Sequence, residues 1–270
     1  CIKQMKIFKN KYSLQKEILS IKNISFIPTM GGLHKGHISL IKESKKKSGK
    51  ILVSIFVNPK QFNNQKDFNT YPRRLKEDLK ILKNLKIDYL YLPNYNDIFN
   101  FKTKNSIYLH NFSKKLCGKT RKGHFEGVLN VVNRFLEIIK PKYIYLGLKD
   151  FQQLYLIEKH IKKNNIQTKV IPCNTVREKN GVACSTRNNN LSKKQLSVAS
   201  DVYNYLEIKK KSTNLNIIKF KKDLFQLGLK RIDYIELINI KNLKKIKKKT
   251  INFKIFIAYY INEIRLIDNI

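Results

Sequence analysis

The chain has 270 residues, 42% of them hydrophobic and 11% aromatic, which allows a sizeable core and excludes an intrinsically disordered tail as a description of the whole. Its apolar runs have the length of a strand, and residues 1–10 are too basic and too interrupted for a secretory signal, so we expect a cytoplasmic protein that makes no membrane contact. The formal net charge of +37 comes from 48 Lys and only 8 Arg in a chain rich in Ile and Asn, and a bias towards A/T-rich codons explains most of it.

Strands and helices alternate along the first two thirds of the chain. Strands are predicted at residues 24–28, 51–57, 88–92, 143–146 and 169–172, and helices at 38–47, 75–85, 127–139 and 154–161. This alternation predicts a Rossmann-like α/β fold, in which a parallel sheet has helices on both faces. A polar stretch at residues 175–192 leads into helices and short strands. We therefore expect a larger domain at residues 1–175 and a smaller C-terminal α/β domain at 176–270.

The first candidate site follows strand 24–28, where residues 28–37 read Pro-Thr-Met-Gly-Gly-Leu-His-Lys-Gly-His. Ligands of parallel α/β sheets bind beyond the carboxyl ends of the strands. The glycines allow close backbone approach, and a helix beginning near His37 offers free N–H groups to phosphates. His34 and His37 can both donate hydrogen bonds to phosphate oxygens and stabilise a leaving pyrophosphate. Two surface histidines in a glycine loop are the alternative.

Two other strand ends carry polar side chains. Asn58 and Gln61 are neutral amides able to recognise the hydroxyl and carboxylate of a small substrate, unless they only close a polar turn. Lys149 can hold phosphates, although it is one of 48 lysines. Asp150 is expected to cap the helix that follows, and Gln153 then faces the cleft.

The polar stretch after residue 175 holds a fourth candidate. Ser185 and Thr186 precede Arg187, and two hydroxyls beside a guanidinium form a clamp for nucleotide phosphates. A helix cap in a surface loop is the alternative. Cys184 has no His or carboxylate partner by spacing, so we expect it to pack. The four cysteines lack a C-x-x-C pair, which favours reduced thiols and argues against a protein-bound metal.

Three remaining histidines carry less information. His124 lies with one Arg in a glycine-bounded loop at residues 118–128, ahead of a predicted helix, and an ordered loop is an equal alternative. Near His110 and His160 the sequence has no second residue at a spacing that would indicate a catalytic or metal-binding pair. We expect both to be ordinary surface residues.

Taken together, these blocks resemble the pantothenate synthetase (pantoate–β-alanine ligase) family. The family motifs P-T-M-G-x-L-H-x-G-H, V-S-I-F-V-N-P-x-Q-F, Y-P-R, G-H-F-x-G-V, G-x-K-D-[FY]-Q-Q and T-V-R-E-x-x-G-x-A-x-S-[ST]-R-N match residues 28–37, 53–62, 71–73, 123–128, 147–153 and 175–188. Residues 265–269 also look like the family's C-terminal end. The resemblance implies the Rossmann-like fold of the His-x-Gly-His nucleotidyltransferases.

The resemblance implies a two-step ligase reaction. ATP and (R)-pantoate form pantoyl adenylate and pyrophosphate with Mg²⁺, and β-alanine then attacks the adenylate to give pantothenate and AMP. ATP activates the carboxylate, so the chemistry needs positioning and positive charge rather than a protein nucleophile. The second domain is expected to act as a lid hinged near Thr175 that keeps water from the mixed anhydride. The family also implies a homodimer.

The family pattern assigns roles residue by residue. His37 matches the active-site histidine with His34 beside it, and Lys149 holds phosphates in the transition state. Gln61 and Gln153 match the pantoate-contacting glutamines, with Asn58 supporting that pocket and β-alanine arriving near Gln61. The residues placed along ATP are Met30, Gly31, Gly32, Leu33, His34, Lys35, Gly36, His37, Gly147, Leu148, Lys149, Asp150, Val176, Cys184, Ser185, Thr186 and Arg187.

Four positions depart from the usual motifs: Leu148 stands for Glu, Lys60 for Met, Lys122 for Pro and Thr186 for Ser. None removes a motif His, Gln, Lys or Arg, so we expect an active enzyme. An adenylyltransferase of the same superfamily is one alternative, and the motifs at residues 53–62 and 175–188 argue against it. A basic nucleic-acid-binding protein is another, but the lysines are scattered and no recognition motif is found, so we expect no specific nucleic-acid partner.

Overall fold

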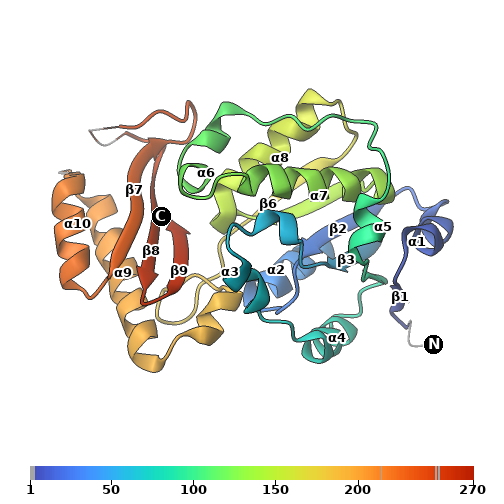
Figure 1. Cartoon of the computed structure of the whole chain (residues 1–270), viewed down its shortest axis with the longest axis horizontal. Coiled ribbons are helices and arrows are strands. Elements are labelled where there is room, and N and C mark those ends of the chain that lie inside the picture. The colour runs from blue at the N-terminus through green and yellow to red at the C-terminus, as the bar shows by residue number, and fades with distance from the viewer. Residues whose placement is uncertain (1–3, 214, 247, 249) are drawn as a thin grey trace. The chain divides into compact units, whose positions relative to one another are not determined.

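The computed structural model describes residues 4–213, 215–246, 248 and 250–270 (Figure 1). The chain divides into two compact units. The first comprises the residues up to Ser113 together with Arg121–Asn174, and the second comprises Thr175–Ile270 together with the short segment Lys114–Thr120. The second unit therefore includes a segment that lies within the first unit in sequence.

Six parallel strands form the sheet of the first unit, in the order β1-β4-β3-β2-β5-β6. The order reverses between β2 and β5, neither of which is an edge strand. In folds of this kind the crevice at that reversal, beyond the carboxyl ends of the strands, is the usual place for a ligand. The strands are β1 (Lys6–Phe8), β2 (Ile24–Thr29), β3 (Lys50–Ile55), β4 (Tyr89–Tyr91), β5 (Tyr143–Gly147) and β6 (Lys169–Cys173).

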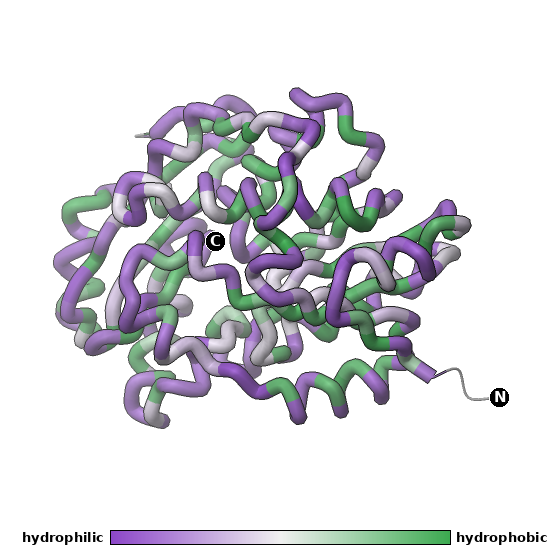
Figure 2. The backbone as a smooth tube through the Cα atoms, turned by 45° about the vertical axis from the view of Figure 1, so that its right-hand side comes forward, coloured by the Kyte–Doolittle hydropathy of each residue, from purple (hydrophilic) through white to green (hydrophobic). Residues whose placement is uncertain are grey.

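Helices cover both faces of this sheet, which confirms the predicted layering. Alternate strand residues point to opposite sides, so that Phe26 packs against one helical layer and its neighbour Ile27 against the other. The first layer holds α1 (Lys11–Ile18), α5 (Tyr95–Phe99), α7 (His124–Ile139) and α8 (Phe151–Lys163), and the second holds α2 (Lys35–Ser44) and α4 (Leu75–Asn84). Short connections add η1 (Pro59–Gln61), α3 (Gln65–Asn69), η2 (Asn111–Lys114) and η3 (Leu148–Asp150). Helical stretches of the tube in Figure 2 alternate between hydrophilic and hydrophobic colours, as one-sided burial requires.

The second unit has an antiparallel sheet in the order β7-β8-β9. Residues of β8 such as Ile255 and Ile257 pack with the helices of the unit in one apolar cluster. The elements are α6 (Cys117–Thr120), η4 (Thr186–Asn190), α9 (Lys193–Lys211), α10 (Ile217–Gln226), β7 (Arg231–Asn239), β8 (Phe253–Ile261) and β9 (Ile264–Asn269). β7 and β8 have nine residues each, so the expectation of short strands here is wrong.

Side chains of β7 and β9 hold the Lys114–Thr120 segment in the second unit. The Arg265 guanidinium donates to Cys117 Sγ at 3.7 Å and to Thr120 Oγ1 at 3.3 Å. The Tyr234 hydroxyl lies 3.0 Å from the same sulfur. These contacts explain why a segment far from residue 175 in sequence belongs to this unit.

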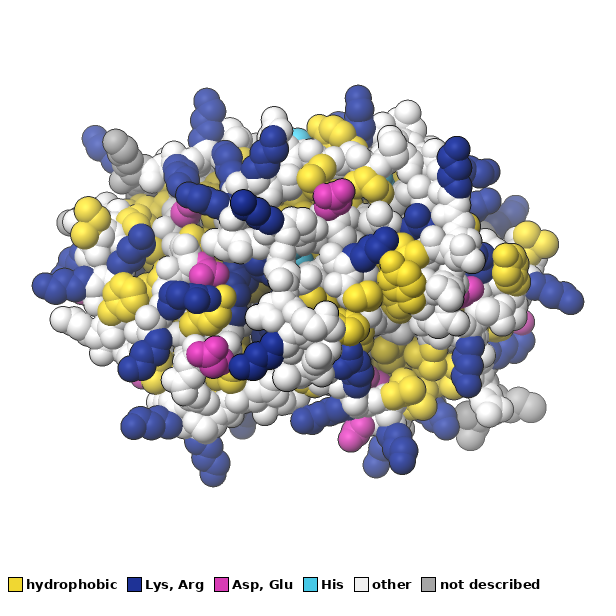
Figure 3. All heavy atoms as spheres, in the orientation of Figure 1, with side chains coloured by type: hydrophobic (Ala, Val, Ile, Leu, Met, Phe, Trp, Pro, Cys, Tyr) yellow, Lys and Arg dark blue, Asp and Glu magenta, His cyan; other side chains and the backbone are white. Residues whose placement is uncertain are grey.

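The surface charge and the cysteines can be compared with what the composition led us to expect. Lys and Arg side chains are dispersed over the face drawn in Figure 3 and do not form a single stripe. The cysteines at positions 117, 173 and 184 are free and buried.

Across the described residues, no helix combines the length and apolarity needed to cross a membrane. Within the same residues no group of three or more His, Cys, Asp or Glu is placed to hold a metal ion.

Candidate active site

The two motif histidines cap the first turn of α2 together. His34 is the N-cap residue, and its Nδ1 accepts the N–H of Gly36 at 3.1 Å. The N–H of His34 in turn donates to Nδ1 of His37 at 3.3 Å, which completes a reciprocal capping box. The ring centroids are 4.1 Å apart. Because of this cap the helix begins at Lys35, two residues before the predicted start near His37.

Both imidazoles have a defined proton arrangement. Each uses Nδ1 as an acceptor, so the proton of a neutral ring lies on Nε2. Burial holds the pKa of His37 well below its usual value, and the electrostatic influence of His34 and Lys149 lowers it further. His37 is therefore neutral at pH 7 and presents Nε2–H as a donor without a charge.

A buried carboxylate on α4 fixes the glycine loop ahead of these histidines. Asp78, only 1% exposed, accepts the N–H of Gly32 at 2.9 Å and that of Leu33 at 2.7 Å. Burial raises the pKa of Asp78, and the two N–H bonds oppose that rise. These two N–H groups bind within the protein. The N–H of Gly36, in the first turn of α2, also does so, and the expectation of free N–H groups at the start of that helix is wrong for this residue. Sequence reasoning missed Asp78, although its place between Leu75 and Leu82 on the apolar stripe of a predicted helix was a signal.

Asn58 and Gln61 lie at the end of β3 and meet the loop that follows β2. The buried Asn58 side chain caps η1, its Oδ1 accepting the N–H of Lys60 at 3.1 Å. Its Nδ2 donates to Gln61 Oε1 at 3.3 Å and to the carbonyl of Gly127 at 3.1 Å. Gln61 Nε2 lies 2.7 Å from the sulfur of Met30. The residues after β2 and β3 are thus in direct contact.

Residues after β5 bring a cation to the same edge of the sheet. Lys149 Nζ lies 3.4 Å from Asp150 Oδ1, and its charge contributes to the lowered pKa of His37. Asp150 occupies the N-cap position of α8, but among the described atoms its carboxylate contacts Lys149 and makes no capping bond, so the predicted cap is wrong. Leu148, where the family usually has Glu, packs against the main apolar cluster. Gln153 is half-buried in the first turn of α8.

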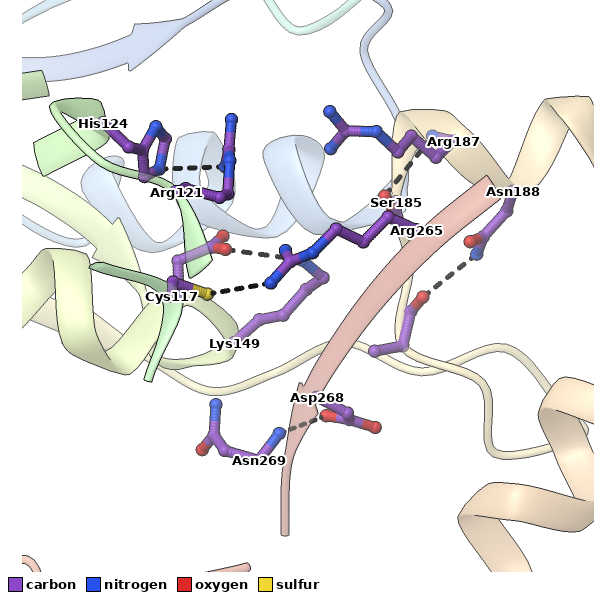
Figure 4. A network of polar contacts seen from close by, with 12 residues as sticks. Cys117, Arg121, His124, Lys149, Ser185, Arg187, Asn188, Arg265, Asp268 and Asn269 are labelled. Carbon is purple, nitrogen blue, oxygen red and sulfur yellow. Dashed lines mark hydrogen bonds and ion pairs between the residues drawn. The ribbon is translucent and has the colours of Figure 1, made fainter. Parts of the chain in front are cut away.

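The remaining predicted nucleotide contacts lie in the second unit and contact one another. The N–H of Cys184 donates to the carbonyl of Val176 at 2.9 Å. Ser185 caps η4 through the N–H of Arg187 at 3.3 Å (Figure 4), so the helix cap considered as an alternative is present. Thr186 is buried and Arg187 half-buried. The thiol of the buried Cys184 donates to Glu178 Oε1 at 3.2 Å.

His160 is fully buried, so the prediction of a surface residue is wrong. Its Nε2 lies 3.0 Å from Asn133 Oδ1, and its Nδ1 accepts the N–H of Tyr108 at 3.2 Å. Burial lowers the pKa of His160 to about 4. The residue lies on the apolar stripe of α8 with Ile157 and Ile161, where a histidine must find partners to be tolerated. His110 is half-buried, and its Nδ1 accepts the N–H of Phe112 at 3.1 Å.

Comparison with known proteins gives a consistent answer. A family model described as Pantoate-beta-alanine ligase matches residues 2–270. The pantothenate synthetase of Francisella tularensis subsp. novicida (strain U112) is 38% identical over 265 residues, which cover 97% of this chain and 94% of that protein. A crystal structure of pantoate-beta-alanine ligase from Francisella tularensis complexed with beta-gamma ATP and beta-alanine matches with a TM-score of 0.85 and 38% identity, covering 99% of this chain and 97% of that one. Pantothenate synthetase from Thermus thermophilus matches with a TM-score of 0.90 and 27% identity, covering 98% and 99%.

Proposed function

Because this chain belongs to the pantoate–β-alanine ligase family and is an ATP-dependent ligase that joins pantoate to β-alanine, we propose that it forms a pantoyl adenylate at the carboxyl ends of β2, β3 and β5. The observation that carries this proposal is the imidazole pair. Two adjacent, mutually tilted rings with their protons on Nε2 lie close enough to Lys149 for its charge to lower the pKa of His37. That combination suits a departing pyrophosphate, because negative charge grows on its oxygens in the transition state.

In the proposed first step a carboxylate oxygen of pantoate attacks the α-phosphorus of ATP. The bond from that phosphorus to the bridging oxygen breaks, and pyrophosphate leaves with the electron pair. His34 and His37 donate from Nε2 to the phosphate oxygens, and Lys149 supplies the positive charge. Removing one such donor typically costs about 10²–10³ in rate. Arg187 of the second unit is retained as a proposed phosphate contact, because a guanidinium donates hydrogen bonds in pairs.

Pantoate recognition is assigned to Gln61, Gln153 and Asn58. The side-chain N–H of Gln61 is directed at the sulfur of Met30, which is a weak acceptor. A substrate hydroxyl or carboxylate can replace that contact with a net gain. In the second step the amine of β-alanine attacks the acyl carbonyl of the adenylate, the bond to the phosphate oxygen breaks, AMP leaves and the nitrogen loses a proton.

The proposal also includes a Mg²⁺ ion, a homodimeric assembly and a cytoplasmic location. Mg²⁺ arrives with ATP, since such ions are held by substrate phosphates and one or two carboxylates. Asp150, with a side chain 47% exposed at the end of β5, fits that requirement. The family resemblance supports a homodimer. Three buried free thiols support the reducing cytoplasm as the place of action.

The test measures the release of pyrophosphate and of AMP when the purified protein is incubated with ATP, Mg²⁺ and pantoate. The assay is run with and without β-alanine. We expect pyrophosphate release to require pantoate and sustained AMP formation to require β-alanine. His37→Ala should abolish turnover while the variant still unfolds cooperatively. Turnover of ATP with a phosphorylated acceptor and none with pantoate would instead identify an adenylyltransferase.

A further inference from the structure

Two side chains converge on one main-chain oxygen, that of Arg121 in the loop before α7 and that of His124, the first residue of the helix. Nδ1 of His124 lies 2.7 Å from the carbonyl oxygen of Gln61, and Nη2 of Arg121 donates to the same oxygen at 3.1 Å. Nη1 of Arg121 lies 3.0 Å from Nε2 of His124 (Figure 4). The three groups therefore form a closed triangle of hydrogen bonds within the first unit.

The geometry fixes the protonation of His124. A carbonyl oxygen only accepts, so the hydrogen in the contact with Gln61 lies on Nδ1. A guanidinium only donates, so Nε2 accepts from Arg121. His124 is therefore neutral, with the tautomer opposite to that of His34 and His37.

The oxygen that this pair binds belongs to the last residue of η1, where a carbonyl has no partner within its own helix. The side chain of the same residue carries the proposed contact to pantoate and touches both Met30 and Asn58. Gly127 also packs against the backbone of η1, and its carbonyl accepts from Asn58. The start of α7 thus determines where the Gln61 side chain lies.

We propose that Arg121 and His124 are positioning residues that fix the main chain of Gln61 and thereby set the affinity of the site for its hydroxy-acid substrate. This inference rests on the proposed function. Neither residue needs to touch the substrate, and each acts through the Gln61 carbonyl. A displacement of about 1 Å at a contacting group can cost on the order of 10²-fold in rate, so loss of the pair should affect pantoate far more than ATP.

Kinetics of four variants test the role. In His124→Asn the amide nitrogen can replace Nδ1 as the donor to the carbonyl, whereas His124→Leu leaves the carbonyl with Arg121 alone. Arg121→Met removes the second donor, and Lys122→Met removes a neighbouring exposed charge as the matched control. We expect His124→Leu and Arg121→Met to raise KM for pantoate roughly 10- to 100-fold with KM for ATP nearly unchanged. His124→Asn should recover most of that loss, and Lys122→Met should match the wild type.

Equal increases in both KM values for His124→Leu, or no increase in either, would overturn the positioning role. A second readout does not depend on turnover. The chain has only five histidines, so nitrogen NMR can assign each tautomer, and we expect Nδ1–H for His124 against Nε2–H for His34 and His37. A charged or Nε2–H ring at position 124 at pH 7 also overturns the proposal. Absence of pantoate-dependent pyrophosphate release in the wild type is a different failure, which contradicts the proposed function.

Discussion

Gly127→Ala probes how closely α7 must approach η1 for the site to work. A Cβ at this position would lie 2.1 Å from the carbonyl oxygen of Lys60 and 3.0 Å from the main-chain nitrogen of Gln61. Real Cβ atoms essentially never come closer than 3.0 Å, and both neighbours are backbone atoms that no rotamer change can move. The helix and η1 must therefore separate by about 0.9 Å.

We expect Gly127→Ala to lower both the free energy of unfolding and the catalytic efficiency. Overpacking of this kind costs typically 1–3 kcal/mol, and the better helix propensity of Ala offsets about 1 kcal/mol of it. The net loss of unfolding free energy should be about 0–2 kcal/mol. The same displacement moves Gln61, so kcat/KM for pantoate should fall on the order of 10²-fold.

Urea unfolding and steady-state kinetics measure the two effects in one preparation. Glu126→Ala is the matched control, because it adds the same residue to the same turn of α7 at an exposed position. We expect its stability and kinetics to stay close to those of the wild type. A folded Gly127→Ala enzyme with wild-type kcat/KM for pantoate would refute the reasoning that the contact between α7 and η1 positions Gln61.

Three further outcomes concern polar groups of the first unit that are wholly or partly buried. Asp78→Asn leaves one of the two loop N–H groups facing an amide nitrogen, which should lower the unfolding free energy by about 1–3 kcal/mol and reduce kcat/KM for ATP. Lys149→Met should reduce kcat by about 10²–10³ and raise the pKa of His37 in an NMR titration, since a positive charge that lowers this pKa is removed. The pKa of His160 is lowered to about 4, so stability present above pH 6.5 should decline by about 3 kcal/mol as the pH falls towards 4. Urea unfolding at several pH values should show that slope, and His160→Gln should lose it.

The fold of the first unit follows from periodicity because its strands are buried on both faces. Residues 51–57 were identified by their uninterrupted apolar character, and β3 occupies Lys50–Ile55 of that run. The stripe of α7 likewise predicted its C-terminal end at Ile139, which Lys140 in a left-handed conformation and Pro141 enforce. The second unit was harder to predict, because frequent Lys and Ile obscure the alternation along β7 and β8.

Candidate site residues that follow the ends of strands could be predicted from the sequence, whereas polar residues inside helices could not. The motifs after β2, β3 and β5 were found because parallel strands bring their carboxyl ends to one edge. Asp78 and His160 were missed because each is a single polar residue on an apolar helix stripe, which periodicity treats as an interruption. The cap assigned to Asp150 failed because Lys149 competes for the carboxylate, and sequence spacing does not rank such competitors.

The loop after β2 differs in one physical respect from a phosphate loop built on main-chain amides. The N–H groups of Gly32 and Leu33 are bound to Asp78, and that of Gly36 to His34. In the proposed chemistry, recognition of phosphate oxygens by this loop is therefore assigned mainly to imidazole Nε2–H groups. An uncharged donor attracts the phosphate of the bound ground state less strongly than a cation does. Its hydrogen bond to the phosphate oxygen strengthens as negative charge develops on that oxygen. The donor therefore stabilises the transition state more than the ground state. Burial and the nearby positive charge of Lys149 lower the pKa of His37 and favour its neutral form, and that neutral form is a condition of the proposed chemistry.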